Sequence, residues 1–139
     1  MKYSVAYYTR SGNTKKVADV IADVLAVDAR DISLELPGKV DVLFLGSSLY
    51  AFTYDESVEK FIEKNAENIG TIVSFSTSAT GKSTAKFVKE CCEKNNIKFY
   101  PHAFKCPGSF LLFNPGRPNE KDLKAVRNFT KSVMEDFGD

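Results

Sequence analysis

Residues 2–25 read KYSVAYYTRSGNTKKVADVIADVL, and the hydrophobic pattern changes in the middle of this stretch. Lys2 to Tyr8 is a short run rich in Tyr and Val, which is typical of a β-strand. After Thr14 the apolar residues recur at the spacing of a helix that covers a sheet with one side; they are Val17, Val20, Ile21, Val24 and Leu25. The six residues between these patterns, TRSGNT, are therefore predicted to form a loop that joins a strand to a helix.

The rest of the chain repeats this alternation of strand and helix patterns. Further strands are predicted at 27–32, 40–46, 69–76 and 97–104, and further helices from about 55, at 82–95 and after 119. Residues 40–46, VDVLFLG, are almost all apolar, as expected for a central parallel strand covered on both faces. Strict alternation predicts one α/β domain over residues 1–139, a three-layer sandwich with a five-stranded parallel sheet and helices on both faces.

Composition and charge narrow the classes of partner. The 139 residues are 43% hydrophobic and 27% charged, with 19 Lys and Arg against 18 Asp and Glu. This balance gives no electrostatic reason to expect nucleic acid or an anionic membrane as partner. No apolar run approaches the length of a membrane-spanning helix, and the first residues do not resemble a signal peptide. Three cysteines without a CxxC pair favour a reducing, cytoplasmic location.

In a parallel sheet the loops that follow the strands open at one edge, and ligands bind there. The candidate loops are 9–14, 47–54, 77–82 and 106–119. In the first, Gly12 allows a positive φ, and Thr9, Ser11, Asn13 and Thr14 offer small polar groups beside the free N–H groups of a helix start. Such a loop can bind a phosphate, although the same residue types also serve as ordinary turn and capping residues.

TRSGNT, placed between a first strand and a first helix, resembles the (S/T)-x-(S/T)-G-x-T phosphate loop of the flavodoxins, small electron carriers that bind FMN. The resemblance extends over essentially the whole chain. It implies a flavodoxin-like sheet with strand order 2-1-3-4-5 and FMN at the switch between strands one and three, as the general rule for this fold states with flavodoxin as its own example. Typical flavodoxins are strongly acidic, whereas this chain carries a net charge of +1.

The resemblance also implies which residues bind FMN. Its phosphate is expected on the first loop, and the isoalloxazine ring between the loops 47–54 and 77–81. Tyr50 is expected to stack on the ring, while Phe52 is expected to pack against the following helix. The full expected set comprises Thr9, Arg10, Ser11, Gly12, Asn13, Thr14, Ser48, Leu49, Tyr50, Ala51, Phe52, Ser76, Thr77, Ser78, Ala79 and Gly81.

A second stretch, FSTSATGKST at 75–84, nearly matches the nucleotide-binding pattern G-x-x-x-x-G-K-[ST]. Ser76 stands where the first glycine belongs, and no strand ending in Asp offers a magnesium partner. We expect instead that Ser83 or Thr84 caps a helix and that Lys82 is exposed. A receiver domain is also disfavoured, because the first strand ends in YYT and lacks paired acidic residues.

The 106–119 segment, CPGSFLLFNPGRPN, is longer than an ordinary connection. It either covers one end of the flavin, with Phe110 or Phe113 as a lid, or packs onto the last helix. The resemblance to the flavodoxins thus implies an FMN-binding carrier that exchanges electrons with redox partner proteins, expected as a monomer or weak homodimer. The alternatives are a small FMN-dependent NAD(P)H or quinone oxidoreductase and a cofactor-free binding domain.

Overall fold

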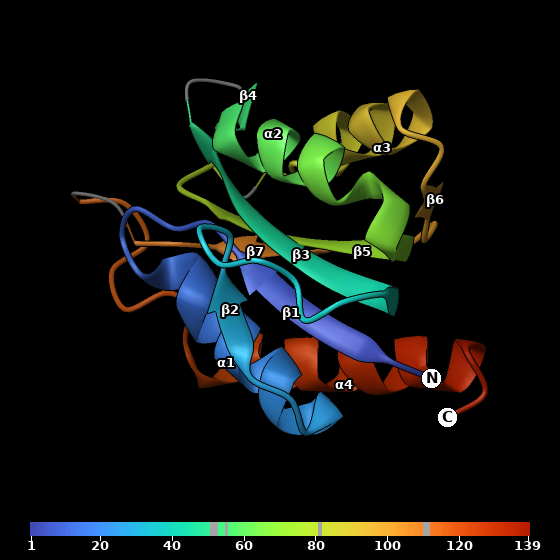
Figure 1. The fold of residues 1–139 in the computed structure, drawn as a ribbon. Coiled ribbons are helices and arrows are strands. Elements are labelled where there is room, and N and C mark those ends of the chain that lie inside the picture. The colour runs from blue at the N-terminus through green and yellow to red at the C-terminus, as the bar shows by residue number, and fades with distance from the viewer. Residues whose placement is uncertain (51–52, 55, 81, 110–111) are drawn as a thin grey trace.

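One sheet of mainly parallel strands organises the molecule (Figure 1). The computed structural model describes residues 1–50, 53–54, 56–80, 82–109 and 112–139, with backbone alone for 49, 50, 53 and 54. The strands are β1 (Tyr3–Tyr7), β2 (Ala29–Asp31), β3 (Val40–Tyr50), β4 (Thr53–Tyr54), β5 (Ile69–Ser78), β6 (Lys98–Phe99) and β7 (Phe104–Pro107).

The strand order confirms the predicted flavodoxin-like topology. The parallel strands follow the order β2-β1-β3-β5-β6, and β7 also pairs in parallel with β5. The short β4 is left out of this count, and β6 and β7 are taken as two parts of one strand. The parallel strands, numbered along the chain, then follow the order 2-1-3-4-5. The short β4 pairs antiparallel with the end of β3. The order reverses between β1 and β3, so the loops after these strands diverge and leave room for a ligand between them.

Helices cover both faces of the sheet, which makes the predicted three-layer sandwich. In Figure 1 helices lie both above the sheet and below it. Those above are α2 (Glu56–Asn65), which continues into the short 3-10 helix η1 (Ala66–Asn68), and α3 (Ala85–Lys94); those below are α1 (Asn13–Leu25) and α4 (Glu120–Asp136). Among the described residues, no helix is both long and apolar enough to cross a membrane.

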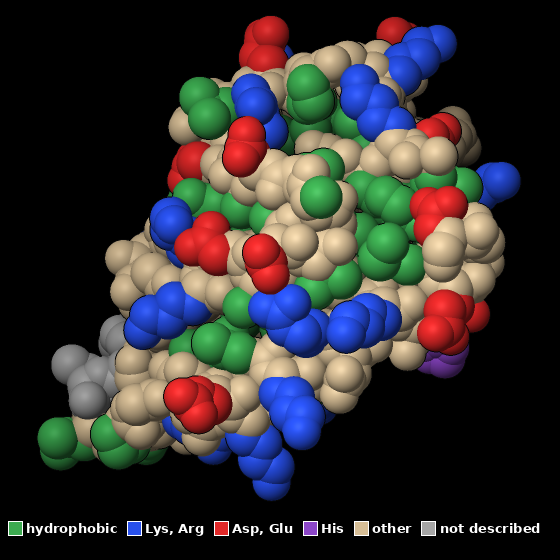
Figure 2. Space-filling model, turned by 90° about the horizontal axis from the view of Figure 1, so that it is seen from below, with side chains coloured by type: hydrophobic (Ala, Val, Ile, Leu, Met, Phe, Trp, Pro, Cys, Tyr) green, Lys and Arg blue, Asp and Glu red, His purple; other side chains and the backbone are tan. Residues whose placement is uncertain are grey.

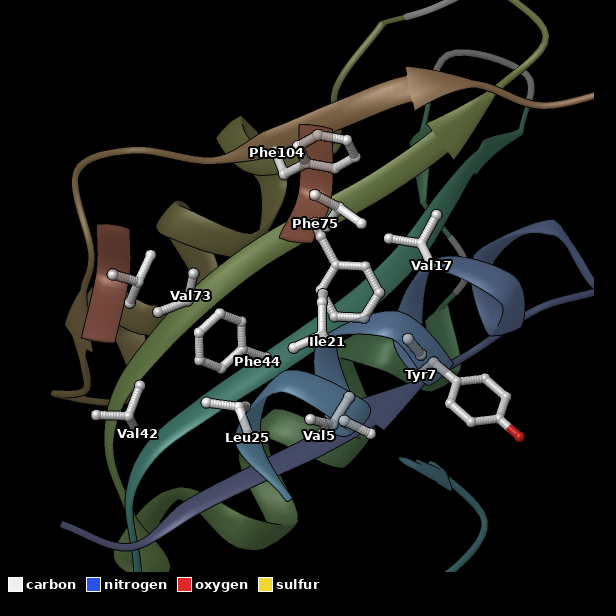
Figure 3. Packing of buried hydrophobic residues seen from close by; sticks show 14 of the residues in the cluster. Val5, Tyr7, Val17, Ile21, Leu25, Val42, Phe44, Val73, Phe75 and Phe104 are labelled. Carbon is white, nitrogen blue, oxygen red and sulfur yellow. The ribbon is translucent and has the colours of Figure 1, made fainter. Parts of the chain in front are cut away.

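The strands bury alternate side chains on opposite faces, because successive residues of a strand point in opposite directions. On the α1 and α4 face, Val42 and Phe44 of β3 belong to one buried cluster. Figure 3 shows Ile21 and Val17 of α1 pointing into this cluster beside Phe75. On the other face, Leu43 of β3 packs in a second cluster; its helical members include Val58, Phe61, Ile62, Val88 and Cys92. Each fully buried side chain of this kind contributes about 1.5–3 kcal/mol.

Two predicted elements differ from the structure at their ends. The fifth strand was expected to run through 97–104, but it is interrupted between β6 and β7. Pro101 explains the break, because proline has no N–H to donate to the sheet after the Tyr100 N–H bonds Ile72 O. The third helix was expected from 82 but begins at Ala85, since the Ser83 hydroxyl accepts the Ala85 N–H at 3.0 Å.

Figure 2 looks onto the face formed by α1 and α4, where Lys and Arg side chains are interspersed with Asp and Glu. Some of these opposite charges are paired, such as Lys15 with Asp19 and Arg127 with Asp23. All four side chains are substantially exposed, so each pair contributes little to stability. This face therefore serves to cover the core and carries no strong field of one sign.

Candidate functional site

The candidate site lies at the edge where the parallel strands end, on the left in Figure 1. The segments that follow β1, β3, β5 and β7 all reach this edge. Direct hydrogen bonds join the four candidate segments 9–14, 47–54, 77–82 and 106–119 to one another. The edge is therefore a connected structure whose geometry follows from side chains that lie far apart in the sequence.

The first loop turns sharply from β1 into α1 at Gly12. This residue has φ 89°, a left-handed conformation that glycine adopts without strain. Its N–H donates to Thr9 Oγ1 at 2.9 Å, which closes the turn. A Cβ built at Gly12 meets no atom within 4 Å, so open space lies on that side of the loop. The loop is thus shaped by its backbone conformation and leaves space in front of the helix.

In the described structure, the first N–H groups of α1 have neither a capping side chain at Gly12 nor an acidic residue in the first turn. The nearest local acceptor is Ser11 Oγ, at a long 3.5 Å from the Asn13 N–H. The free N–H groups and the positive end of the helix dipole therefore remain available to an anion. In contrast, the Asn119 side chain caps the start of α4. In the turn after β2, the Ser33 N–H donates to the Asp31 side chain.

Asn13 and Arg10, both expected on the phosphate, have partners within the protein. The side-chain amide of Asn13 is buried and donates to Ser109 O at 2.9 Å, which ties the first loop to the 106–119 segment. Gly108 is close by, and a Cβ there would lie 2.9 Å from Asn13 Nδ2. Arg10 is exposed, and its Nε donates to the Tyr8 hydroxyl at 3.3 Å. The Asn13 side chain therefore holds the loop in place, and the Arg10 Nε–H is used within the protein.

Three buried hydroxyls meet beneath the first loop. Thr14 Oγ1 lies 2.7 Å from Ser48 Oγ and 2.9 Å from Thr77 Oγ1, and these two are 3.3 Å apart. All three side chains are 5% exposed or less. Gly46 allows this approach, since a Cβ there would overlap the Phe75 ring and lie 2.9 Å from Thr14 Cγ2. The triangle joins the start of α1 to the ends of β3 and β5.

The second segment was predicted as a loop over 47–54, and this was wrong for most of its length. β3 continues through Ser47, Ser48, Leu49 and Tyr50, and then turns back as β4. Strand structure is possible for the two serines because Ser48 joins the triangle and Ser47 Oγ bonds Thr84 Oγ1 at 2.6 Å. Ala51 and Phe52 lie outside the described residues, as do the side chains of Leu49 and Tyr50. Stacking by Tyr50 stays a prediction.

The third segment is also strand for longer than predicted, because β5 runs through Ser76, Thr77 and Ser78. Their hydroxyls are used internally: Ser76 Oγ accepts the Thr84 N–H at 3.3 Å, and Ser78 Oγ donates to Lys82 O at 2.9 Å. Lys82 is exposed. The Thr84 side chain, expected as a possible cap, makes no capping hydrogen bond at the start of α3, while the Ser83 hydroxyl accepts the Ala85 N–H. Gly81 lies outside the described residues.

The 106–119 segment contacts both the candidate loops and the last helix. Asn114 Nδ2 donates to Ala79 O at 2.7 Å and to Gly108 O at 3.3 Å. Sequence reasoning missed Asn114, although the turn-forming run NPG marked the place. Leu112 and Phe113 beside it are 95% and 61% exposed. Phe110, the other lid candidate, lies outside the described residues.

Arg117 and Asp122 anchor the far end of this segment. Arg117 donates twice to the Asp122 carboxylate, at 2.6 and 2.7 Å, and the Asn119 N–H donates to the same group at 2.9 Å. The hydrogen bonds from Arg117 are the main cause that lowers the pKa of Asp122, and the Asn119 N–H adds to it. Asn119 in turn caps α4. The spacing N-x-x-D at 119–122 is the sequence signal for this capping box.

The remaining reactive groups are poorly placed for chemistry. Cys106 is buried, and burial raises the pKa of its thiol to about 12. His102 is exposed in the turn between β6 and β7, where it packs edge-on against Tyr100. Two cavities are lined by described residues. One of about 330 Å³ lies between the β2–β3 connection and α2, with Tyr8 in its lining, and one of about 470 Å³ lies near Met1 and Leu25.

Comparison with known proteins gives one consistent result. A family described as the flavodoxin domain matches residues 4–134. An uncharacterized protein of Methanocaldococcus jannaschii is 30% identical over 136 residues, which cover 88% of this chain and 91% of the relative.

Solved structures share the fold at low sequence identity. A flavodoxin from the domain Archaea has a TM-score of 0.79 at 20% identity, covering 98% of both chains. Oxidised flavodoxin 2 from Bacillus cereus has a TM-score of 0.71 at 19% identity, with 98% of this chain and 99% of that one covered. A Fusobacterium nucleatum flavodoxin bound to flavin mononucleotide has a TM-score of 0.69 at 12% identity, with the same coverage. At such identities these likenesses establish the fold.

Proposed function

This chain belongs to the flavodoxin family, and from that premise we propose that it binds FMN without a covalent bond and works as an electron carrier. The observation that carries the proposal is the start of α1. There the Gly12 turn has open space in front of it, and the described first turn has no capping side chain and no acidic residue. A doubly negative phosphate ester fits this arrangement.

Each part of the first loop has a stated task in binding. The N–H groups at the start of α1 would donate to the phosphate, and the exposed Ser11 hydroxyl would add a donor. Thr9 holds the Gly12 turn through its hydroxyl. Thr14 and Asn13 would act indirectly, since they hold the loop against β3, β5 and the 106–119 segment. Arg10 would contribute positive charge at the mouth of the loop.

The ring would lie between the two neighbouring segments. One is formed by Ser48, Leu49, Tyr50, Ala51 and Phe52, and the other by Ser76, Thr77, Ser78, Ala79 and Gly81. The flavin supplies the redox chemistry, because its ring takes up and releases electrons. The task of the chain is to hold the ring, to limit its contact with water and to place one edge where a partner protein can approach. This task requires no general acid, general base or nucleophile.

A pair of variants at Gly12 tests the phosphate site. Asn and Asp have nearly the same size and both tolerate the positive φ at this position, so they differ in charge alone. We expect Gly12→Asp to weaken FMN binding at least about ten-fold more than Gly12→Asn, which corresponds to about 1.4 kcal/mol. The measurement is a titration of apoprotein with FMN, followed by the quenching of flavin fluorescence.

Equal affinities of the two variants would move the phosphate away from Gly12. Absence of any binding by the unaltered protein at micromolar FMN would overturn the proposed function itself. The carrier is also expected to show no steady oxidation of NAD(P)H with a quinone when it is the single protein present. Sustained turnover in that assay would favour an oxidoreductase of the same fold.

A further inference from the structure

The near-neutral net charge of the chain conceals a strong separation of charge along the sequence. Residues 68–119 contain seven Lys and Arg but two Asp and Glu, namely Glu90 and Glu93. The rest of the chain contains twelve Lys and Arg against sixteen Asp and Glu. No acidic residue occurs between Asn68 and Lys89 or between Lys94 and Asn119. One part of the chain is therefore clearly basic and the remainder acidic.

The fold turns this separation in sequence into two sides of the molecule. Residues 68–119 form β5, α3, β6 and β7, which lie together at one side of the sheet, while β2 and β1 lie at the other. In Figure 1, β6 and α3 accordingly lie at the end of the sheet that is farther from β2. The basic side includes two of the segments that approach the candidate ring position, 76–81 and 106–119.

Lys82, Lys86 and Lys105 bring this charge to the edge where β5 ends. Lys105 of β7 is in register with Ser76, and the Ser76 hydroxyl accepts the Thr84 N–H at the start of α3. Lys86 follows in the first turn of that helix, and the Lys82 carbonyl is bound by Ser78. All three lysine side chains are exposed. They form what we call the basic rim.

An apolar tip stands beside the basic rim. Leu112 is 95% exposed and Phe113 is 61% exposed, although both are large hydrophobic residues. The tip is held in place because Asn114 binds Ala79 O and Gly108 O, and because Arg117 N–H binds Asn114 O at 3.1 Å. An exposed apolar group with charged side chains near it is the usual composition of a protein-binding surface.

We propose that the basic rim and the Leu112–Phe113 tip form the docking surface for redox partner proteins whose own contact surface is acidic around an apolar recess. The proposal rests on the proposed electron-carrier function and names the partner of that site. A protein fits this surface better than a nucleic acid, because the exposed Leu112 and Phe113 side chains offer apolar area that a phosphate backbone cannot cover.

Two soluble haem proteins of opposite surface charge serve as probes: cytochrome b5, which is acidic, and cytochrome c, which is basic. Each is immobilised, and the dissociation constant of this protein is measured at ionic strengths from about 10 to 300 mM. We expect binding to cytochrome b5 that weakens as ionic strength rises, and weaker or no binding to cytochrome c. This measurement needs no flavin, so it stands even if FMN binding fails.

Matched charge reversals locate the surface. The test variant is Lys86→Glu with Lys105→Glu, and the control is Lys39→Glu with Lys131→Glu, which changes the net charge equally at the opposite edge of the sheet. At low ionic strength we expect the test variant to bind cytochrome b5 at least about ten-fold more weakly and the control to stay within about two-fold. Phe113→Ser is expected to weaken binding without changing its dependence on salt.

Several results would overturn the proposed docking surface. Preference for cytochrome c, absence of binding to either protein at low ionic strength, or equal losses in test and control variants would each overturn the docking surface. Tight binding of a random DNA duplex that depends on Lys86 and Lys105, without binding to cytochrome b5, would assign the rim to nucleic acid and also overturn it. FMN content, measured separately for every variant by absorbance, reports on the proposed function alone.

Discussion

At the scale of single residues, the triangle of Thr14, Ser48 and Thr77 decides how the candidate site is held. Each hydroxyl carries one proton and can accept two hydrogen bonds, so a closed set of three satisfies all its members without water. This matters because a buried hydroxyl without a partner is costly. The triangle therefore allows polar residues to lie at the centre of the sheet edge, directly beneath the loop that we propose for phosphate.

Replacing Thr14 by Val tests this role. The substitution keeps the shape but removes the hydroxyl that contacts Ser48 and Thr77. We expect a loss of about 1–2 kcal/mol in the free energy of unfolding, measured by urea denaturation of the apoprotein. Thr14→Ser keeps the hydroxyl and is the control. If the Val variant is as stable as the unaltered protein, the hydroxyl triangle does not contribute to holding the edge.

At the scale of elements, the two helix starts at the ends of the site are built in opposite ways. α4 begins with a complete capping box, in which Asn119 and Asp122 bind each other's backbone N–H groups. α1 begins at a glycine with no capping side chain in the described structure. A helix start that is satisfied internally holds a segment in place, and one that is left open can bind a ligand. This chain has one helix start of each kind. Asp122 belongs to the internally satisfied one, so we assign it a structural role.

Removing the Asp122 side chain should destabilise the protein in a pH-dependent manner. Its pKa is lowered in the folded state, mainly by Arg117. Its contribution is therefore present above the unfolded pKa of about 4 and is lost as pH falls through the lower folded value. We expect Asp122→Ala to lose about 1–3 kcal/mol near pH 7 and distinctly less near pH 2–3.

Urea unfolding at both pH values measures this difference. Lys124→Ala, an exposed change in the same helix, is expected to remain within about 0.5 kcal/mol of the unaltered protein. A loss that is equal at neutral and acidic pH would show that packing, and not the ionised carboxylate, holds this end of the segment.

At the scale of the whole molecule, the two hydrophobic clusters on either side of the sheet bury all three cysteines. Cys106 belongs to the cluster beneath the sheet, and Cys91 and Cys92 belong to the one above it. Burial raises the pKa of both Cys92 and Cys106 to about 12, so neither thiol forms the reactive thiolate near neutral pH. The cysteines therefore contribute to packing, and electron transfer through a disulfide is not expected.

Thiol labelling tests this description of the core. At about pH 8 we expect iodoacetamide to modify the native protein at least about 100-fold more slowly than the urea-unfolded chain, because reaction requires a thiolate and access to it. Mass spectrometry after timed quenching counts the modified thiols. Rapid native labelling of Cys106 would contradict its burial and reopen a redox role for it.

Local patterns were sufficient for much of the fold. The period of Val17, Ile21 and Leu25 predicted α1, and the apolar run at 40–46 predicted a central strand, because these signals depend on neighbours in sequence. The ends of β3 and β5 were predicted less well. Ser47, Ser48 and Thr77 look like loop residues in sequence, yet hydroxyl partners from α1 and α3 allow them to stay in strands.

The sequence by itself determined the layered α/β architecture and the place of the loop that turns at Gly12, while the strand order was implied by the resemblance to the flavodoxins. Only the tertiary structure decided that Asn13 and Asn114 bind other loops, that Cys106 is inert, and that the basic residues of 68–119 collect on one side. The physical reason is distance along the chain: periodicity and turn chemistry act between near neighbours. Hydrogen-bond partners, burial and surface fields depend on residues that only folding brings together.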